Sequence, residues 1–313
     1  MKASYEKINY NIRAAKCIER KMLCESFRRL SVFGKIESYN YVGFGSTYFS
    51  DFSFFHKSLD IRNMISIEKD ENNKDRFEFN RPFRCIKMEY GSSNEILQKL
   101  NWDARTILWL DYDGRLNQEV LLDINSFCTK VTPGSLIIIS VNAEPGKELG
   151  TRFQKLRDAV GHKKIPEGTR EKDLLKWGTA KVFRAIIYNE IMQILNGRNG
   201  VRSQGNKLCY RQLFNFNYSD GAKMLTTGGI IYDEGQRPLF DRCSFRDLLY
   251  IREEDEAYHI EIPNLTFKEI RYLDEQLPRK QGQTLTISGV RQADINKYEK
   301  VYRYFPAFTE ANL

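Results

Sequence analysis

Two segments of this chain, 106–110 and 135–140, are apolar over almost the whole length of a strand. A strand becomes this uniformly apolar when both faces of its sheet are covered, which is typical of parallel sheets flanked by helices. Three further strand-like segments precede them, at 39–42, 63–67 and 83–88, and helical patterns separate neighbouring segments. This alternation predicts an α/β fold with a Rossmann-like, doubly wound, mostly parallel sheet.

The pattern changes towards the end of this series. Two long strand-like runs, 208–218 and 223–232, are joined through Ser219-Asp220-Gly221. An Asp-Gly pair between two such runs is a strong hairpin signal, because both residues tolerate the positive φ angles of a tight turn. The parallel sheet is therefore expected to end in an antiparallel hairpin.

Helical patterns stand at both ends of the chain. An amphipathic helix is expected at 13–30, and two more are expected near 265 and over 292–304. The predicted organisation is an N-terminal helical segment at 1–38, a Rossmann-like domain at 39–235 that contains a basic insert at 147–207, and a small helical appendage at 236–313.

The first strand-like segment runs into Gly43-Phe44-Gly45-Ser46, and the second ends on Glu68. Glycines at such a turn let the backbone bend sharply and approach a ligand closely. Glu68 follows Gly45 by 23 residues, near the spacing at which an acid accepts hydrogen bonds from both ribose hydroxyls of an adenosine. The combination predicts a site for a nucleoside-containing cofactor.

Positive charge is concentrated in one part of the chain. The net charge is +8, and the stretch 147–211 alone holds fifteen Lys and Arg against six Asp and Glu. Such a concentration favours an anionic partner, either RNA, DNA or a phosphorylated metabolite. The alternative is a solvated helical face without a partner.

Composition also bears on the compartment. The six cysteines are not arranged as Cys-x-x-Cys pairs, and they are expected to be free thiols in a reducing, cytoplasmic environment. No apolar run approaches the roughly 20 residues that cross a bilayer, so no membrane partner is expected.

Taken together, these features resemble the class I S-adenosylmethionine-dependent methyltransferases. The resemblance covers about 39–232 and lies in the turns that follow strands one to four and in the terminal hairpin. It implies S-adenosylmethionine as the cofactor, with the first turn around the methionine part, the acid after strand two on the ribose, and the residues after strand three at the adenine. The implied cofactor-binding residues are Gly43, Phe44, Gly45, Ser46, Glu68, Lys69, Gly91, Ser92 and Asp111.

Two positions depart from the pattern of that family. Tyr41 stands where an acid two residues before the first glycine usually lies close to the methionine ammonium, and Thr47 stands in place of a third glycine. Another anion, such as Asp111, is then expected to meet the ammonium.

Asp111-Tyr112-Asp113-Gly114 follows strand four, whose end faces the ligand in open α/β folds. We expect Asp111 and Asp113 to be the catalytic carboxylates, acting as a general base or holding the cofactor ammonium. The alternative is a simple turn with a helix cap. Asn142 follows strand five and completes a possible set of oxygen ligands with these two acids, but three ligands are few for a hard divalent cation, and no metal is assigned.

Arg13 and Lys16 precede the sheet, as do the helices that cover the cofactor in many methyltransferases. They are candidates for the cofactor carboxylate or for a substrate anion, and a surface helix with solvated charges is the alternative reading.

The predicted function is S-adenosylmethionine-dependent methyl transfer, to an oxygen of a phosphate-bearing or nucleic-acid substrate. Two alternatives remain open at this stage. One is a non-catalytic Rossmann-like module that binds nucleic acid or a protein, and the other is an NAD-dependent oxidoreductase, in which Gly-x-Gly followed by an acid also occurs.

Overall fold

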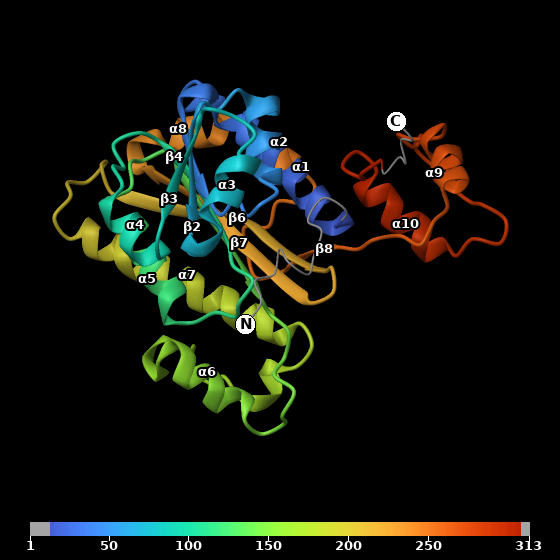
Figure 1. The fold of residues 1–313 in the computed structure, drawn as a ribbon. Coiled ribbons are helices and arrows are strands. Elements are labelled where there is room, and N and C mark those ends of the chain that lie inside the picture. Colours follow the sequence, from blue (N-terminus) through green and yellow to red (C-terminus); the bar gives the residue numbers. More distant parts are fainter. Residues whose placement is uncertain (1–12, 308–313) are drawn as a thin grey trace.

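The computed structural model describes residues 13–307, which form an eight-stranded sheet with helices on both faces (Figure 1). The N-terminal residues 1–12 and the C-terminal residues 308–313 of the predicted segments lie outside the described part. The strands are β1 (Asn40–Gly43), β2 (Asn63–Glu68), β3 (Ile86–Tyr90), β4 (Thr106–Asp111), β5 (Ser135–Asn142), β6 (Leu208–Ser219), β7 (Lys223–Asp233) and β8 (Tyr258–Ile260).

The strand order is β3-β2-β1-β4-β5-β7-β6-β8. Strands β1 to β5 pair in parallel, and β7 inserts antiparallel between β5 and β6. The predicted Rossmann-like sheet with a terminal hairpin is thus confirmed. The order in which strands are added reverses between β1 and β4, since β2 and β3 lie on one side of β1 whereas β4 and β5 lie on the other. Open α/β sheets bind their ligands at such a switch point.

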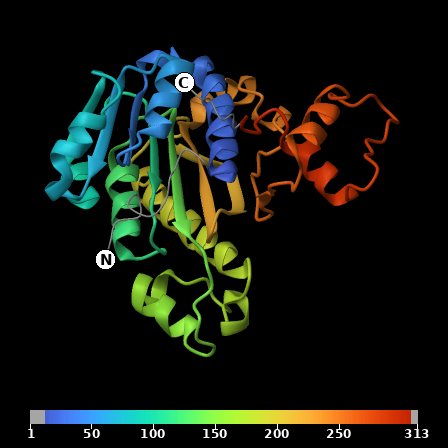
Figure 2. The same ribbon diagram turned by 45° about the vertical axis from the view of Figure 1, so that its right-hand side comes forward.

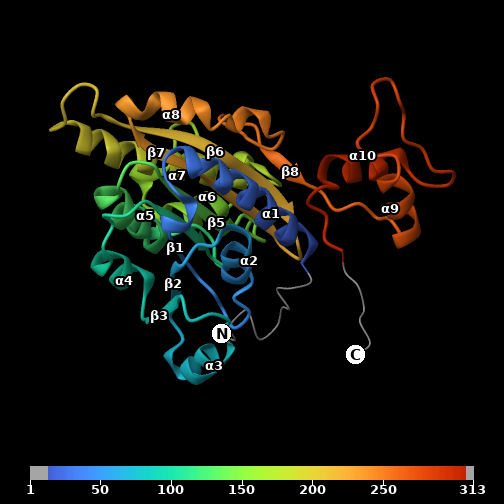
Figure 3. The same ribbon diagram turned by 90° about the horizontal axis from the view of Figure 1, so that it is seen from above.

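Alternate side chains of each central strand enter two different cores. On β4, Ile107 and Trp109 pack with α1 (Ala14–Arg29), α2 (Ser50–Leu59) and α8 (Arg237–Arg242). Leu108 and Leu110 pack with α4 (Ser93–Lys99), α5 (Gln118–Lys130) and α7 (Gly178–Asn199). Figure 3, which looks down on the molecule, shows α1 and α8 in front of the strands and α7 behind them. Both faces are therefore dry, which explains why the strand sequences are apolar without alternation.

Helices alternate with the strands as the sequence predicts, but the short helix α8 was not predicted. The helices are α1 (Ala14–Arg29), α2 (Ser50–Leu59), α3 (Lys74–Asn80), α4 (Ser93–Lys99), α5 (Gln118–Lys130), α6 (Arg152–Val160), α7 (Gly178–Asn199), α8 (Arg237–Arg242), α9 (Phe267–Asp274) and α10 (Gln292–Val301). None of the helices within residues 13–307 combines the length and the apolar character that crossing a bilayer requires.

The basic insert has two parts with different surroundings. Helix α7 lies along the sheet and buries one face, which includes Phe183, Ile187 and Ile191. Helix α6 and its flanking turns project below the sheet (Figure 1). One part of the insert, α7, thus belongs to the core, and the other part, around α6, projects from it.

The C-terminal region differs from the expected appendage at 236–313. Strand β8 pairs in parallel with β6, and side chains such as Phe240, Phe245 and Tyr250 belong to the main core. Only α9, α10 and the loops around them form a separate small cluster, centred on Leu273 and Tyr298. Figure 2 shows this unit standing apart from the sheet. The sequence prediction missed β8 because a three-residue strand carries too little pattern to recognise.

Candidate functional site

A cavity of about 380 Å³ opens at the carboxyl ends of β1, β2, β3 and β4. Parallel strands carry their carboxyl ends to one edge of the sheet, so residues far apart in the chain meet there. The lining residues include Phe44, Gly45, Ser46, Glu68, Lys69, Gly91, Ser92, Asp111 and Asp113, which were predicted from the sequence. They also include Arg20, Ser50, Asp51, Trp109 and Tyr112, which were not predicted as site residues.

The two glycines after β1 have different roles. A Cβ at Gly45 would lie 2.6 Å from the Phe49 ring and from Ser66 Oγ, so only glycine fits this turn beside the cavity. Gly43 does not line the cavity, and a Cβ there would lie 2.8 Å from the carbonyl oxygen of Trp109 on β4. Gly43 therefore allows two strands to pack closely, a structural role rather than the predicted contact with a cofactor.

Glu68 points back towards the glycine turn from the end of β2. Its Oε1 accepts a hydrogen bond of 2.6 Å from the backbone N–H of Ser46, and the residue is 9% exposed. Burial raises the pKa of Glu68 to about 7, although the hydrogen bond from Ser46 opposes this shift. Glu68 is thus a buried acceptor that changes its charge near neutral pH.

The end of β3 supplies the far side of the cavity. Gly91 adopts a φ of +134°, a conformation that favours glycine, and turns the chain into α4. The hydroxyl of Ser92 then caps α4 by accepting from the backbone N–H of Glu95 at 3.3 Å. The sequence predicted both residues in the cavity, and the turn and the cap explain how they are held there.

Asp111, at the end of β4, is joined to helix α1 by a buried ion pair. The Nζ atom of Lys16 lies 2.8 Å from Asp111 Oδ1 and 2.7 Å from Glu19 Oε2, and it donates to the hydroxyl of Tyr218 at 3.0 Å. It also lies 4.6 Å from the centre of the Trp109 ring. Lys16 is 1% exposed, so the reading of a solvated surface lysine is wrong.

The charge of Lys16 is stabilised by its partners. Burial lowers the pKa of Lys16, but the carboxylates of Asp111 and Glu19 more than offset this, so that its pKa lies above its ordinary value. The ammonium group thus stays charged and fixes the carboxylate of Asp111 at the cavity wall. Since one Asp111 oxygen already faces this ammonium, Asp111 is less free to meet a second cation than the sequence suggested.

A second acid, Asp51, enters the cavity from the first turn of α2. It accepts a hydrogen bond from the hydroxyl of Tyr41, the residue that replaces the usual strand-one acid. Burial raises the pKa of Asp51, and the positive charge of Arg20 opposes that shift. Sequence inspection missed Asp51 because its distance from the glycine turn depends on how α2 begins.

Arg20 lies one helical turn after Lys16 on α1 and is 8% exposed. Its Nε atom is buried and has no hydrogen-bond partner within residues 13–307. The i, i+4 spacing of these two cations was the available signal, since it places them on one helix face.

A second cavity of about 450 Å³ lies beside the first and shares Arg20 and Ser50 with it. Its other lining residues include the cations Lys21 and Lys57. The shared residues make the two cavities neighbours across α1 and α2.

The basic insert begins at the same edge of the sheet, because β5 runs parallel to β4. The loop after β4 contacts the segment just before the insert, where Arg115 donates to the carbonyl oxygen of Glu144. Several cations of the insert already have acidic partners: Lys155 pairs with Glu148, and Lys164 pairs with Glu190.

Of the three residues considered for a metal, Asp111 and Asp113 line the cavity and Asn142 does not. The side-chain oxygen of Asn142 accepts from the backbone N–H of Glu144 at 2.8 Å. Within residues 13–307, no group of three or more His, Cys, Asp or Glu side chains is placed to hold a metal ion.

The cavity fits an adenosyl cofactor with an amino-acid tail. Its size lies in the range of small-molecule sites, about 300–1,000 Å³. Gly45 leaves room for close approach, and Glu68 offers a buried carboxylate beside the glycine turn. Arg20 and Asp51 add one positive and one negative charge to the lining.

Comparison with known proteins agrees with this geometry. Residues 8–313 match the model of a family described as "Putative O-methyltransferase". No curated protein sequence matches the chain.

Several solved structures share part of the fold. Trm1 from Pyrococcus horikoshii, in complex with S-adenosyl-L-methionine, is 9% identical, with a TM-score of 0.45 over 72% of this chain and 57% of that one. An O-methyltransferase from Bacillus cereus, in complex with SAH, is 14% identical, with a TM-score of 0.36 over 66% and 80%. LepI, in complex with SAH and a substrate analogue, is 9% identical, with a TM-score of 0.33 over 62% and 43%.

This chain thus spans about half the length of LepI and Trm1. Because these likenesses are weak, the assignment of the fold rests on the strand order itself. The family match confirms the methyltransferase class, and with it S-adenosylmethionine as the cofactor of that class, and it removes the support for an NAD-dependent oxidoreductase.

Proposed function

Because this chain belongs to the O-methyltransferase family whose model it matches, we propose that it transfers a methyl group from S-adenosylmethionine to an oxygen of an anionic acceptor. The observation that carries the proposal is the convergence of Gly45, Glu68, Asp111 and Asp113 on one cavity at the switch point of the sheet. These residues come from three separate strand ends, those of β1, β2 and β4.

The cofactor, when bound, supplies an electrophilic methyl group on a sulfonium sulfur. The turn at Phe44-Gly45-Ser46 would enclose its central part, and the carboxylate of Glu68 would accept from the ribose hydroxyls. Lys69, Gly91 and Ser92 would surround the adenine. Each residue lines the cavity, and the buried carboxylate of Glu68 is directed at the glycine turn.

The two acids after β4 would divide the work at the acceptor. Asp111 is held by Lys16, so we assign it the positioning of charge beside the reacting methyl group. Asp113 is exposed at the cavity rim, where an incoming hydroxyl is within reach, and we assign it the role of general base. It would take the hydroxyl proton as the acceptor oxygen bonds to the methyl carbon and the bond from that carbon to sulfur breaks, with S-adenosylhomocysteine as the leaving group.

The acceptor is expected to carry negative charge. The second cavity, with Arg20, Lys21 and Lys57 in its lining, offers a cationic surface next to the cofactor cavity. A phosphate-bearing small molecule fits this surface by size and sign. RNA or DNA would in addition need the exposed cations of the insert, such as Arg157 and Lys163.

The test is methyl transfer from labelled S-adenosylmethionine to a cell extract. Asp113→Asn is expected to lower transfer by about 10²- to 10⁴-fold, the range for loss of a general base. Binding of S-adenosylhomocysteine should change by less than about twofold, since a base that acts only in the transition state affects turnover alone.

Asp103→Asn provides the matched control. Asp103 is also an exposed acid, but it lies just before the first residue of β4, at the edge of the sheet away from the cavity. Transfer by Asp113→Asn equal to that of the control would remove Asp113 from the mechanism. A parent protein that binds the cofactor but labels nothing would favour a non-catalytic module.

A further inference from the structure

The amino-acid end of the proposed cofactor is a zwitterion, and the usual acid for its ammonium group is replaced here by Tyr41. We propose that Arg20 and Asp51 together form a clamp for this end, with Arg20 on the carboxylate and Asp51 on the ammonium. The clamp rests on the proposed function, and it assigns two residues that the sequence pattern of the family did not indicate.

The first observation is the unused hydrogen-bonding capacity of Arg20. The residue is 8% exposed, and its buried Nε has no hydrogen-bond partner within residues 13–307. Leaving a buried donor unpaired costs about 1–3 kcal/mol, and more for a charged group, so such donors usually have a ligand or a water as partner. Arg20 lines the cofactor cavity, and a guanidinium binds a carboxylate with two parallel hydrogen bonds.

The second observation is how Asp51 is held. The Tyr41 hydroxyl donates to its Oδ2 atom, and Tyr41 itself is fully buried between Phe52 and Phe55. The strand position that usually carries the acid thus carries a tyrosine that orients an acid on the next helix. The acid thus lies on helix α2 instead of on strand β1, and it still lines the cavity.

The third observation concerns the competing anion. Asp111, the alternative partner for the ammonium, already has an Oδ1 contact of 2.8 Å with Lys16. Asp51 has no such cation: Arg20 influences it electrostatically, but among the described residues no salt bridge joins the two. The guanidinium of Arg20 and the carboxylate of Asp51 are therefore near each other without forming an ion pair. Each can then bind the oppositely charged group of a zwitterion that lies between them.

The experiment compares three ligands by calorimetry on the full chain. S-adenosylhomocysteine carries both charged groups, 5′-(3-aminopropylthio)adenosine keeps only the amine, and 5′-methylthioadenosine lacks both. Arg20→Met should weaken S-adenosylhomocysteine by about 10- to 100-fold, as expected for a charge-assisted pair, and leave the other two ligands within about twofold. Asp51→Asn should weaken the first two ligands and spare the third.

Two matched controls remove equal charges nearby. Arg28→Met takes an exposed cation from the last turn of α1, and Asp60→Asn takes an acid from just beyond the end of α2; neither residue lines either cavity. Both should bind all three ligands like the parent. Arg20→Lys should recover part of the lost affinity for S-adenosylhomocysteine, since it restores the charge without the planar fork.

The outcomes separate the two proposals. If the parent binds all three ligands and the variants weaken them equally, or weaken none, the clamp is wrong and the proposed function stands. If the parent binds none of them, the proposed function fails and the clamp fails with it.

Discussion

The cofactor edge of the sheet and the basic insert were both singled out by sequence, but the structure treats them differently. At the cofactor edge, residues from four strand ends converge on one cavity, and their charges are buried and oriented. In the insert, an excess of positive charge is divided among exposed ion pairs, a helix face in the core and a protrusion. Topology fixes where strand ends meet, whereas a count of charges does not say where they point.

This contrast predicts that the same change of charge has very different effects in the two regions. The largest effect is expected at Lys16, the least exposed cation of the cofactor edge. Lys16→Met leaves the carboxylates of Asp111 and Glu19 without their cation, and breaking a buried pair in this way lowers the free energy of unfolding by about 3–5 kcal/mol. Urea denaturation measures the loss.

The double variant Lys16→Met with Glu19→Gln should recover part of that loss, because one of the stranded charges is then removed. Lys57→Met, on the exposed side of α2, should change stability by less than about 0.5 kcal/mol. A Lys16→Met protein as stable as this control would contradict the larger effect expected at the cofactor edge.

A smaller effect, on affinity, is expected at Glu68. The pKa of Glu68 in the folded protein is about 7, above the ordinary value of 4.5. Between these two pH values the acid is therefore mostly neutral in the folded protein and mostly ionised in the unfolded chain. Its contribution to stability falls as pH rises through this range, because the unfolded chain ionises first. Ligand affinity should instead rise with pH, because the ionised carboxylate accepts from both ribose hydroxyls.

Binding of 5′-methylthioadenosine, measured from pH 8 to pH 6, should therefore weaken towards acid, by at most about tenfold per pH unit. Glu68→Gln should abolish this slope and weaken binding at pH 8 by about 10- to 100-fold. Glu89→Gln, which changes a carboxylate outside the cavity lining, should keep the slope. An unchanged slope in Glu68→Gln would exclude Glu68 as its source.

The smallest effect is expected in the insert. Replacement of Lys155, Arg157, Lys163 and Lys164 by Ala should leave cofactor affinity within about twofold, since none of them lines either cavity. If RNA or DNA binds there, the slope of the logarithm of its affinity against the logarithm of the salt concentration should become shallower by about two. The expected change is two and not four because two of the four cations already have acidic partners.

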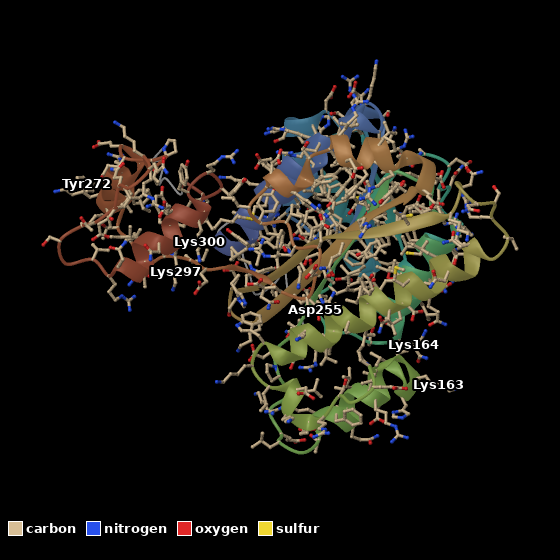
Figure 4. All side chains as sticks on the ribbon, turned by 180° about the vertical axis from the view of Figure 1, so that it is seen from behind. Lys163, Lys164, Asp255, Tyr272, Lys297 and Lys300 are labelled. Atoms are coloured by element: carbon tan, nitrogen blue, oxygen red, sulfur yellow. The ribbon has the colours of Figure 1, made fainter. Side chains whose placement is uncertain are left out.

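Filter binding at two salt concentrations measures this change. Figure 4 shows Lys163 and Lys164 on the protruding insert and Lys297 and Lys300 on the C-terminal unit. Lys297→Ala with Lys300→Ala is therefore the control, and it should leave the salt dependence unaltered. Retention that is equal and independent of salt in all three proteins would count against a polyanionic substrate.

The residues whose location at the cavity could be predicted are those that depend on strand order alone. Gly45, Glu68, Asp111 and Asp113 each follow a strand directly, so the parallel sheet brings them to one edge. Gly43 shows the limit of this reasoning, since a glycine in the same motif serves strand packing instead.

The residues that were missed depend on how helices dock. Arg20 and Asp51 reach the cavity only because α1 and α2 pack together on the sheet, a contact that no local pattern encodes. Lys16 was noticed in the sequence, but its burial depends on Tyr218, which lies 202 residues away. Long-range contacts of this kind leave no periodic pattern in the sequence from which they could be predicted.

That separation along the chain has a consequence for biosynthesis. At about 5–20 residues per second, the ribosome needs roughly 10–40 s to make the 202 residues between Lys16 and Tyr218. Until then the helix that carries Lys16 lacks part of the wall against which it packs. Helix α1 precedes every other helix within residues 13–307, yet it is among the last of them to complete its packing. A nascent chain released before Tyr218 would expose the apolar face of α1 to chaperones and proteases.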